Sequence, residues 1–446
     1  MPPSVTGTRI VLTPMPPTHF GAGAIDGLAG IARGAGGDAA VIVTDQGLAT
    51  TAMVASVAGV LTAGGLPVTV FSDVHPNPTT GDVAAGADAV TALIATGARP
   101  VIIAVGGGSP IDAAKGIAVA AVNPERGRDL DYRRTFAQPA LPLVAVPTTA
   151  GTGTETNAFG VITDPLARRK FYVGGPACLP AAAILDPDLT LGLPPAATAA
   201  TGMDALVHAL ESSMSLRANP WSEGIALQAI RMVSAFLPRA VADGADREAR
   251  SQMLLASHLA GVAFASTGLG ICHAIGHALG GRFGIAHGVA LTLVLPQVLR
   301  FNSPACEERL AEVAFAFGAG VTAKSAQWNA GAAIEAVTGL AARVGFTRLL
   351  PDFGVTPADF PQISADALDD EVLINTPRMP TAADIESILA AAYRLRLAAA
   401  FEPSVLDPEE FSVNTTEKSS GSWKYRRWDM PHQIRNGPRG PGFQKL

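Results

Sequence analysis

Short apolar runs alternate with helical patterns through the first half of the chain. Five of these runs are rich in β-branched residues and end at Gly, Pro or Asp, which is typical of buried strands. They cover residues 39–45, 66–73, 100–108, 141–149 and 181–186. Between several of them lie Ala-rich segments with helical periodicity, at 48–63, 80–97 and 110–121. This alternation predicts a parallel sheet with helices on both faces.

The pattern changes after Pro194. From about 197 to 399 we find no convincing strand, and helical patterns dominate. Examples are 197–215, 220–236, 247–265, 270–281, 304–319, 328–344 and 382–399. The sequence therefore predicts a Rossmann-like α/β domain over residues 1–194 and an all-α domain over residues 195–400.

Residues 401–446 have a third character. From Ser412 onward the chain is polar and lacks apolar periodicity, and residues 418–446 hold seven Lys or Arg against one acidic residue. Two of the four tryptophans, Trp423 and Trp428, also lie there. We expect a flexible tail; a basic, aromatic docking segment and a cloning-derived extension are the alternatives.

Composition narrows the class of protein. The 446 residues, 48% of them hydrophobic, suffice for two domains with large cores, and the net charge of −6 argues against a general nucleic-acid binder. The three cysteines form no CxxC pair, and the N-terminus lacks a secretory signal. Apolar stretches such as 254–265 are too short to span a bilayer. We therefore expect a cytoplasmic protein with neither nucleic acid nor membrane as partner.

The strand at 100–108 runs into three glycines, Gly106 to Gly108, and we expect Ser109 to cap a helix after them. Glycines let backbone N–H groups approach a diphosphate closely, and the helix N-terminus adds unpaired donors. Asp112 and Lys115 lie on the first turns of that helix. The loop is not GxGxxG, so an ordinary tight turn is the alternative.

A second polar loop, VPTTAGTGTET (146–156), also follows a strand, and its hydroxyls suit phosphate and ribose. The alternative is an ordinary surface loop, but two such loops favour a nucleotide crevice. Asp45 ends the first long strand. Its carboxylate suits ribose hydroxyls and would repel a 2′-phosphate, which favours NAD over NADP. A simple helix N-cap is the alternative role for Asp45.

The helical half holds a cluster of metal-ligating residue types. Two pairs lie four residues apart, each on one helical face, and a further histidine follows a break that we place at Gly281. The five are Asp204, His208, His273, His277 and His287. In apolar surroundings such groups are costly unless they have a partner, and imidazole with carboxylate suits Fe, Zn or Co. Spacing alone does not decide between His273 and His277 as a ligand.

Taken together, these segments resemble the iron-containing (group III) alcohol dehydrogenases, a family that includes lactaldehyde reductase and 1,3-propanediol dehydrogenase. The resemblance covers about residues 8–400 in the family's order and spacing. It is carried by HFGAGAIDGL (19–28), VIVTD (41–45), GGGSPIDAAK (106–115), VPTTAGTGTE (146–155), VITD (161–164), TGMDALVHALE (201–211), the segment 268–302 and INTPRMPTAADI (374–385). It implies a dinucleotide-binding α/β domain, a helical metal-binding domain, and a site between them, as in the dehydroquinate synthase-like fold.

The resemblance also implies roles for single residues. Metal ligands are matched by Asp204, His208, His273 and His287, and His277 matches a histidine beside substrate and nicotinamide. Cofactor positions are matched by Asp45, Asn77, Gly107, Gly108, Ser109, Asp112, Thr148, Thr149, Thr152, Lys170 and Leu189. By this resemblance the ion polarises the substrate oxygen, nicotinamide carries the hydride, and His277 relays a proton. It implies NAD rather than NADP, Fe²⁺ or alternatively Zn²⁺, and a homodimer or higher homo-oligomer.

The chain departs from lactaldehyde reductase at Phe159, where that enzyme has an asparagine. This makes the pocket more apolar and weakens the inference that lactaldehyde is the substrate, and we expect Phe159 and Phe264 to form an apolar pocket wall. Two other functions are alternatives. A dehydroquinate synthase-like carbon–oxygen lyase needs several Lys and Arg for its phosphate-bearing substrate, and the metal helices offer mainly Arg282. A non-catalytic scaffold or filament protein would not need the four ligands, which are intact.

Overall fold

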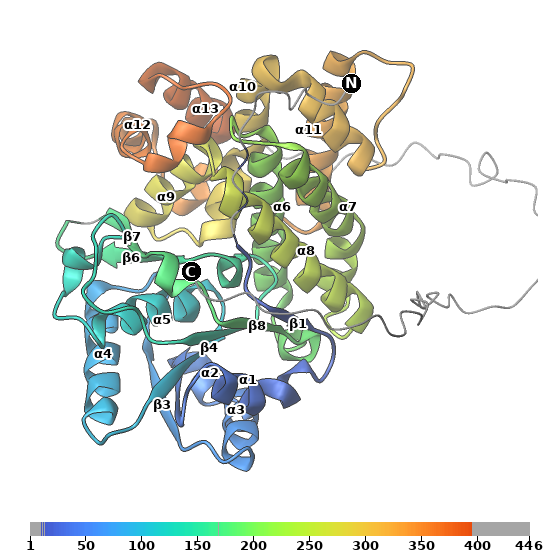
Figure 1. The fold of residues 1–446 in the computed structure, drawn as a ribbon. Coiled ribbons are helices and arrows are strands. Elements are labelled where there is room, and N and C mark those ends of the chain that lie inside the picture. The colour runs from blue at the N-terminus through green and yellow to red at the C-terminus, as the bar shows by residue number, and fades with distance from the viewer. Residues whose placement is uncertain (1–9, 11, 13, 168, 395–446) are drawn as a thin grey trace, which may run out of the picture. The chain divides into compact units, whose positions relative to one another are not determined.

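Six parallel strands form the sheet of the N-terminal half (Figure 1). The computed structural model describes residues 10, 12, 14–167 and 169–394. The strands are β1 (Thr18–Phe20), β2 (Ala39–Asp45), β3 (Val68–Val74), β4 (Pro100–Gly106), β5 (Leu143–Pro147) and β8 (Ala182–Leu185). Their order across the sheet is β1-β8-β5-β4-β2-β3, so the strands just before the glycine loop and the threonine loop, β4 and β5, are neighbours.

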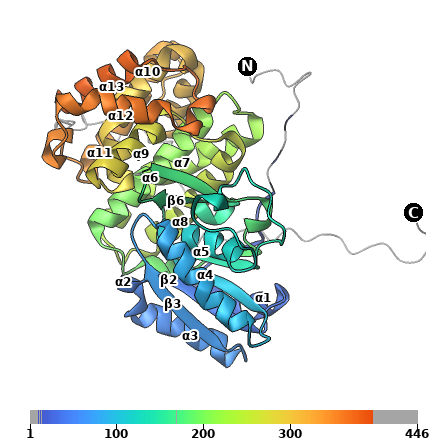
Figure 2. The ribbon, with the colours of Figure 1, turned by 90° about the vertical axis from the view of Figure 1, so that its left-hand side faces the viewer.

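Helices cover both faces of this sheet, as predicted (Figure 2). Because side chains alternate along a strand, Ile103 of β4 packs in the core with α1 (Leu28–Gly34) and α3 (Ala52–Ala63). Its neighbour Ile102 packs in the opposite core with α4 (Thr80–Ile94) and α5 (Gly108–Ala120). The predicted helix at 48–63 is divided, because α2 (Gln46–Ala49) ends before α3 begins.

A hairpin of β6 (Phe159–Asp164) and β7 (Arg169–Gly174) was not predicted from the sequence. Its strands pair with each other and not with the main sheet. Along β6 buried residues alternate with more exposed ones, so it lacks the continuous apolar run of the sheet strands. The hairpin lies close against α5, because a Cβ atom at Gly160 would come within 2.6 Å of the carbonyl oxygen of Asp112.

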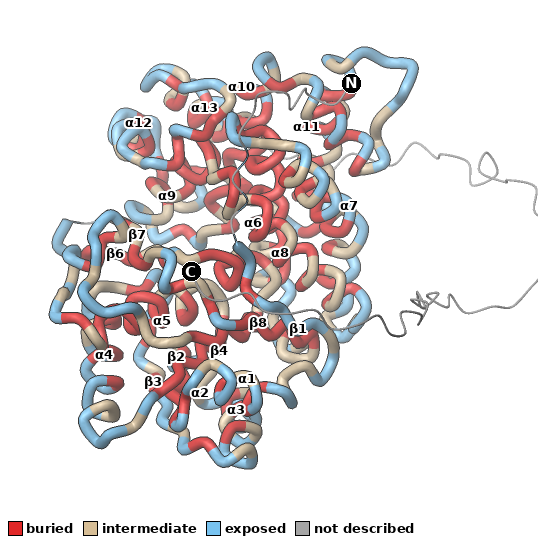
Figure 3. The backbone as a smooth tube through the Cα atoms, in the orientation of Figure 1, coloured by how far each residue is buried: buried red, intermediate tan, exposed pale blue. Residues whose placement is uncertain are grey.

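The second half is helical, and between residues 195 and 394 the described chain contains no strand, as predicted. The helices are α6 (Pro195–Met214), α7 (Pro220–Ala242), α8 (Arg247–Thr267), α9 (Ile271–Phe283), α10 (His287–Ala316), α11 (Ala326–Arg343), α12 (Phe360–Leu368) and α13 (Ala382–Arg394). Buried residues gather along α6 at the centre of this half (Figure 3). Helix α6 begins at Pro195, although a division into separate domains there stays a prediction.

Two details of the helical half differ from the sequence-based expectation. The break before His287 is not at Gly281, because α9 continues to Phe283 and ends at the left-handed Gly284 (φ 65°). Helix α10 begins at His287 rather than near 304, and it is kinked at Cys306, whose φ of −149° and ψ of 34° are not helical; the predicted helix at 304–319 corresponds to the part that follows this kink after Pro304. The predicted tail at 401–446 lies outside the described residues.

Helix α7 is long and apolar enough to pass a test for a membrane span by length and composition. Its apolarity has a local explanation. Ala226, Ile230, Val233 and Leu237 on its inner face are buried in the core of the helical half. This spacing of three or four residues is that of an amphipathic helix packed on a protein interior.

Candidate metal centre and cofactor cleft

Three helices bring four of the five candidate ligands together. Asp204 and His208 come from α6, His273 comes from α9, and His287 is the first residue of α10. One potential ligand atom from each lies within 4.8 Å of the other three. Close packing fixes the start of α10 against α6, because a Cβ atom at Gly288 would lie 2.0 Å from the carbonyl oxygen of Ala200.

The distances within this group are those of a coordination shell. Oδ1 of Asp204 lies 3.5 Å from Nε2 of His208, 3.8 Å from Nε2 of His273 and 3.6 Å from Nε2 of His287. These separations are longer than hydrogen bonds. Ligand atoms about 2.1 Å from a tetrahedral metal ion are roughly 3.4 Å apart, which is close to the observed spacing.

Two atoms at the centre are buried and unpaired. Oδ1 of Asp204 and Nε2 of His273 have no hydrogen-bond partner among the described residues. Such atoms are rare in proteins because the loss of solvation is uncompensated. A divalent ion bound by the four side chains would satisfy both atoms, so these residues fit a metal.

Groups behind the ligands hold their rings in place. Nδ1 of His273 lies 2.6 Å from Oε2 of Glu211, whose carboxylate also accepts the backbone N–H groups of Gly270 and Cys272. Nδ1 of His208 lies 3.2 Å from the carbonyl oxygen of Gly151. When Nδ1 of each ring is used in this way, Nε2 is left facing the centre, as is usual for histidine ligands.

Glu211 was not among the residues predicted from the sequence. It lies on the same helix as Asp204 and His208, seven and three residues further on, so helical periodicity places all three on one face. Burial raises the pKa of Glu211 to about 7. That spacing, together with a carboxylate inside an apolar helix, is the signal that could have revealed it.

The electrostatics of the centre favour ligand forms of the side chains. Burial lowers the pKa of His273 well below its usual value, and the neighbouring His208 and His277 lower it further. Burial also lowers the pKa of His287 well below its usual value, with His273 and His277 contributing. Both imidazoles are therefore neutral at pH 7, with a lone pair available for a metal.

His277 lies beside this group and is held differently. Its ring stacks on His287 at 5.4 Å between centroids, and its Nδ1 lies 2.7 Å from Oδ2 of Asp370. Asp370 precedes a short 3-10 helix (Glu371–Asn375) and caps it by accepting the N–H of Val372. Burial raises the pKa of Asp370, but the hydrogen bond and charge of His277 outweigh it, and the net pKa is lowered. Asp370, too, was absent from the sequence-based site.

A cavity of about 1030 Å³ joins this centre to the α/β half. Side chains from both halves line it, and they include all four candidate ligands and His277. Of the predicted cofactor and pocket residues, it is lined by Asn77, Gly108, Ser109, Asp112, Phe159, Thr152, Lys170 and Phe264. The cavity lies beyond the ends of β4 and β5, where ligands bind in doubly wound α/β folds.

The glycine loop is shaped by close contacts. Gly106 has φ +151°, and a Cβ atom there would lie 2.5 Å from Pro110. Cβ atoms at Gly107 and Gly108 would press on Thr149 and Thr152, at 3.2 and 2.9 Å. The two predicted loops are therefore in contact. Ser109 does not cap the helix, because α5 begins at Gly108 with Gly107 as its N-cap residue and no side-chain cap.

The polar side chains Asp112 and Lys115 of α5 form hydrogen bonds within the protein. Asp112 accepts hydrogen bonds from the hydroxyl of Thr154 at 2.6 Å and the N–H of Val161 at 3.0 Å. Lys115 is fully buried, and burial lowers its pKa to about 8. Its Nζ donates to two carbonyls, one hydroxyl and one amide oxygen, those of Thr154, Asn157 and Phe159. This pair therefore joins the threonine loop and the hairpin to α5.

The remaining predicted cofactor residues have local roles in the structure. Asp45 caps α2 by accepting the N–H of Leu48 at 2.9 Å, and Lys170 donates to Asn77 at 3.0 Å across the cleft wall. Asp45, Gly107, Thr148, Thr149 and Leu189 are not among the residues that line the cavity. Thr148 is buried, and its N–H donates to the carbonyl of Gly106, so its contribution is to the loop's shape.

One contact crosses the mouth of the cleft. The hydroxyl of Tyr132, in the α/β half, donates to Oε2 of Glu371 at 2.8 Å, and Arg133 forms an ion pair with the same carboxylate at 2.9 Å. The Tyr132 ring meets Phe159 edge-on, with 5.3 Å between centroids. On the other side, Phe264 stacks on His208 at 4.6 Å. The two phenylalanines predicted as pocket wall thus both lie against residues of the cleft.

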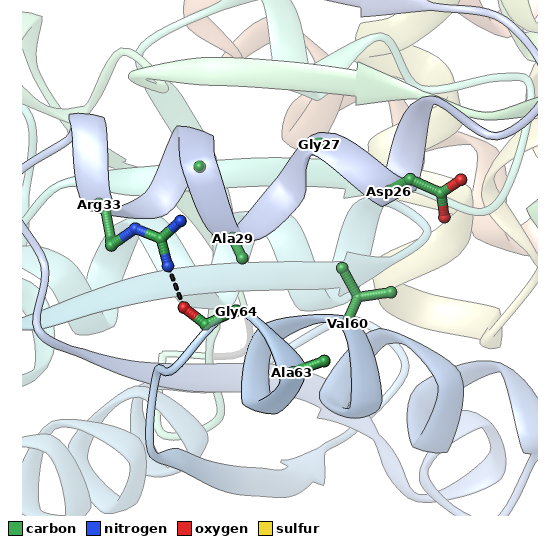
Figure 4. A pocket seen from close by; sticks show the side chains of 8 residues that line it. Asp26, Gly27, Ala29, Arg33, Val60, Ala63 and Gly64 are labelled. Atoms are coloured by element: carbon green, nitrogen blue, oxygen red, sulfur yellow. Dashed lines mark hydrogen bonds between the residues drawn. The ribbon is translucent and has the colours of Figure 1, made fainter.

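A second hollow lies between α1 and α3 (Figure 4). Gly27, Gly64 and their neighbours line it, and Arg33 donates to the carbonyl of Gly64. It contains none of the residues predicted to bind metal, cofactor or substrate. The larger cleft is therefore the site to which the sequence-based expectations lead.

Comparison with known proteins agrees with this geometry. Residues 16–187 match the family model of iron-containing alcohol dehydrogenases, and residues 198–393 match the C-terminal model of the same family. The 1,3-propanediol dehydrogenase of Klebsiella pneumoniae is 39% identical over 360 residues, 80% of this chain and 92% of the relative. The NAD-dependent methanol dehydrogenase of Bacillus methanolicus is 35% identical over 377 residues, 84% of this chain and 98% of the relative.

A solved structure supports the same family assignment. The crystal structure of a 1,3-propanediol oxidoreductase matches with a TM-score of 0.83 and 38% identity, covering 86% of this chain and 100% of that one. The chain therefore belongs to the iron-containing alcohol dehydrogenase family, as its sequence motifs predicted. It is an oxidoreductase of that family, which is favoured over the lyase and scaffold alternatives.

Proposed function

We propose that the protein is a metal-dependent alcohol dehydrogenase and aldehyde reductase that uses NAD, with Asp204, His208, His273 and His287 as the metal ligands. The observation that carries this proposal is the set of three Nε2 atoms 3.5 to 3.8 Å from one buried, unpaired carboxylate oxygen. One carboxylate with three imidazoles accepts iron or zinc, and we propose Fe²⁺ because of the family. When bound, the ion supplies Lewis acidity to the substrate oxygen, and NAD supplies the hydride chemistry.

The chain's own residues position the reactants. The glycine loop and the N-terminus of α5 hold the dinucleotide diphosphate, with Gly107, Gly108 and Ser109 offering backbone N–H groups. Phe159 and Phe264 keep water from the alcohol carbon on either side of the cleft. The contacts of Thr149 and Thr152 with the glycines keep the loop open for the diphosphate rather than filled by side chains.

We assign the proton transfer to His277. Its Nδ1 is taken by Asp370 at 2.7 Å, so Nε2 is the atom left to exchange a proton with the alcohol hydroxyl or the cofactor ribose. Asp370 then acts as a positioning residue that fixes the ring and its tautomer. Because His277 lies outside the four-residue group, its removal leaves the ligand set intact.

The test is an assay of purified protein with NAD, with Fe²⁺ or Zn²⁺, and with a panel of alcohols and aldehydes. Failure to reduce NAD with any alcohol and to oxidise NADH with any aldehyde would refute the function. His277→Ala should keep its metal by elemental analysis and lose about 10²- to 10⁴-fold in kcat. His273→Ala should lose the metal itself. Equal metal loss in the two variants would overturn the roles given to them.

We also propose that the enzyme works in the cytoplasm as a homodimer or higher homo-oligomer, following the family resemblance. The three cysteines are free and buried, which suits a reducing compartment. Light scattering on the purified protein would measure the mass in solution, and a monomer at micromolar concentration would contradict the assembly.

A further inference from the structure

Large apolar side chains are exposed along one wall of the cleft. Ile374 is 74% exposed, Met379 is 60% exposed and Leu368 is 38% exposed, and all three line the cavity. Phe159, at 41%, faces the same cavity from the α/β half. Apolar side chains that gather at the rim of a cavity, rather than singly over a surface, are typical of a ligand-binding surface.

The carboxylates of Asp370 and Glu371 on the same wall already have partners, whereas Oδ1 of Asn375, which also lines the cavity, is buried with no hydrogen-bond partner among the described residues. Asp370 is bonded to His277 and to the N–H of Val372, and Glu371 is bonded to Tyr132 and Arg133. Their hydrogen-bonding capacity is therefore largely used within the protein. Because Asn375 is buried, the surface that the segment 371–380 exposes to a ligand is chiefly the apolar surface of Ile374 and Met379.

The two walls of the cleft suit different molecules. Ser109, Thr152 and Lys170, from the α/β half, provide donors for a dinucleotide with its phosphates and riboses. The helical half provides the ligand group and the apolar rim. An alcohol with its oxygen at the ligand group has its remaining atoms in this cavity, and an apolar chain gains free energy there as it leaves water.

We propose that the enzyme is selective for primary alcohols with an extended, uncharged apolar tail, and that Ile374 and Met379 bind that tail. This inference rests on the proposed function. It differs from the short or polar alcohols named for the propanediol and methanol relatives, which would not reach an apolar rim.

Arg217 suggests the main alternative to a neutral tail, which is a substrate tail with a negative charge. It lines the same cavity and is exposed, and the described part of the chain offers its guanidinium no carboxylate partner. A cation at the rim would favour a tail that ends in a carboxylate. The apolar side chains outnumber this single, solvated charge, and so we favour the neutral tail.

The experiment measures kcat/KM of the metal-loaded enzyme with NAD for primary n-alkanols from ethanol to octanol. We expect about a two- to fourfold rise for each added methylene, because burial of one methylene contributes about 0.8 kcal/mol when complete. A flat or falling series would overturn the inference while leaving the dehydrogenase function intact. The absence of turnover with every alcohol would instead refute the proposed function.

Two variants test whether Ile374 and Met379 bind the apolar tail of the alcohol. The double substitution Ile374→Ser with Met379→Ser should reduce the rise per methylene to less than about twofold. The matched control is Leu166→Ser, since Leu166 is 97% exposed and does not line the cavity; this variant should keep the wild-type slope. Unchanged slopes in the double variant would overturn the assignment, and equal melting temperatures of all three proteins would show that folding is not the cause.

A preference of more than about tenfold for ω-hydroxy acids over alkanols of equal length would overturn the neutral tail in favour of Arg217.

Discussion

The metal centre and the polar cluster behind the glycine loop are both buried, yet they use their polar atoms in opposite ways. Lys115 donates to four oxygen atoms of the loop and hairpin around it, so it is fully paired within the chain. At the metal centre, Oδ1 of Asp204 and Nε2 of His273 have no such partner among the described residues. Buried polar groups that the chain satisfies hold the fold, whereas unsatisfied ones that gather beside metal-ligating side chains indicate a ligand.

The comparison changes how the motif GGGSPIDAAK is interpreted. The family resemblance placed Asp112 with the cofactor-binding positions, beside the glycines. In the structure its two carboxylate oxygens accept from Thr154 and Val161. Asp112 and Lys115 keep the surrounding loops in place, and the contact of the glycines, Ser109 and Asp112 with the cofactor stays a prediction.

The strongest test of the contrast between the unpaired and the paired polar clusters is Asp204→Ala. Removal of the shared carboxylate takes away the only anionic ligand of the proposed set, so we expect the metal to be lost and kcat to fall by about 10³-fold or more. Elemental analysis and steady-state kinetics measure the two effects. Full metal content in this variant would mean that the four-residue group is not the metal site.

Substitution in the hydrogen-bonded cluster around Lys115 should change the stability of the protein. Lys115→Met removes four hydrogen bonds to buried oxygen atoms and leaves Asp112 without its neighbouring cation, and we expect the free energy of unfolding to fall by about 3 kcal/mol or more. Urea denaturation measures this change. The control is Lys170→Met, which loses one exposed hydrogen bond to Asn77 and should change the free energy of unfolding by about 1 kcal/mol at most. Similar losses in both would contradict the structural role given to Lys115.

Glu211→Gln tests the support behind a ligand. A carboxamide holds the His273 ring less firmly than a carboxylate, and we expect metal affinity to fall about 10- to 100-fold. Competition with a chelator would measure it. Glu155→Gln is a matched control, because Glu155 forms a similar buried pair with His258 at 3.0 Å without contacting a candidate ligand. If both variants lose affinity equally, then the effect is a general loss of folding and not one of ligand support.

The smallest effect is expected at Asp45. Asp45→Ser keeps an acceptor for the N-cap of α2 but removes the negative charge that we propose to lie near the ribose. We expect the ratio of kcat/KM for NADPH to that for NADH to rise by up to about fivefold, since the repulsion is worth about 1 kcal/mol in solvent. An unchanged ratio would leave Asp45 with its capping role alone.

Much of this architecture could be predicted from the sequence, because its signals are local. Continuous β-branched runs marked β2, β4 and β5, and helical spacing placed Asp204 with His208 on one face. The pairings that complete the site are not local. His273 is 62 residues from Glu211, and His277 is 93 residues from Asp370. Which carboxylate meets which ring depends on how α6, α9 and the segment after α12 pack, and no single-segment pattern contains that information.

The hairpin of β6 and β7 shows the same limit. It carries Phe159 and Lys170 to the cleft, but β6 alternates in burial and neither strand belongs to the main sheet. The position of the hairpin is set by contact with α5, through Gly160 and the acceptors of Lys115. A sequence pattern can indicate a strand, yet it cannot indicate that a helix elsewhere holds that strand against a ligand cavity.

The four proposed ligands differ in exposure, and this would affect the lifetime of an ion bound there. The side chains of Asp204, His208 and His273 are 4%, 5% and 1% exposed, whereas that of His287 is 31% exposed. The centre therefore opens into the cleft on the side of His287, and chelators, oxidants and competing ions arrive by the same route as the alcohol. With dinucleotide and alcohol occupying that route, the exchange of the ion with solution should slow, and turnover itself would protect the enzyme from demetallation.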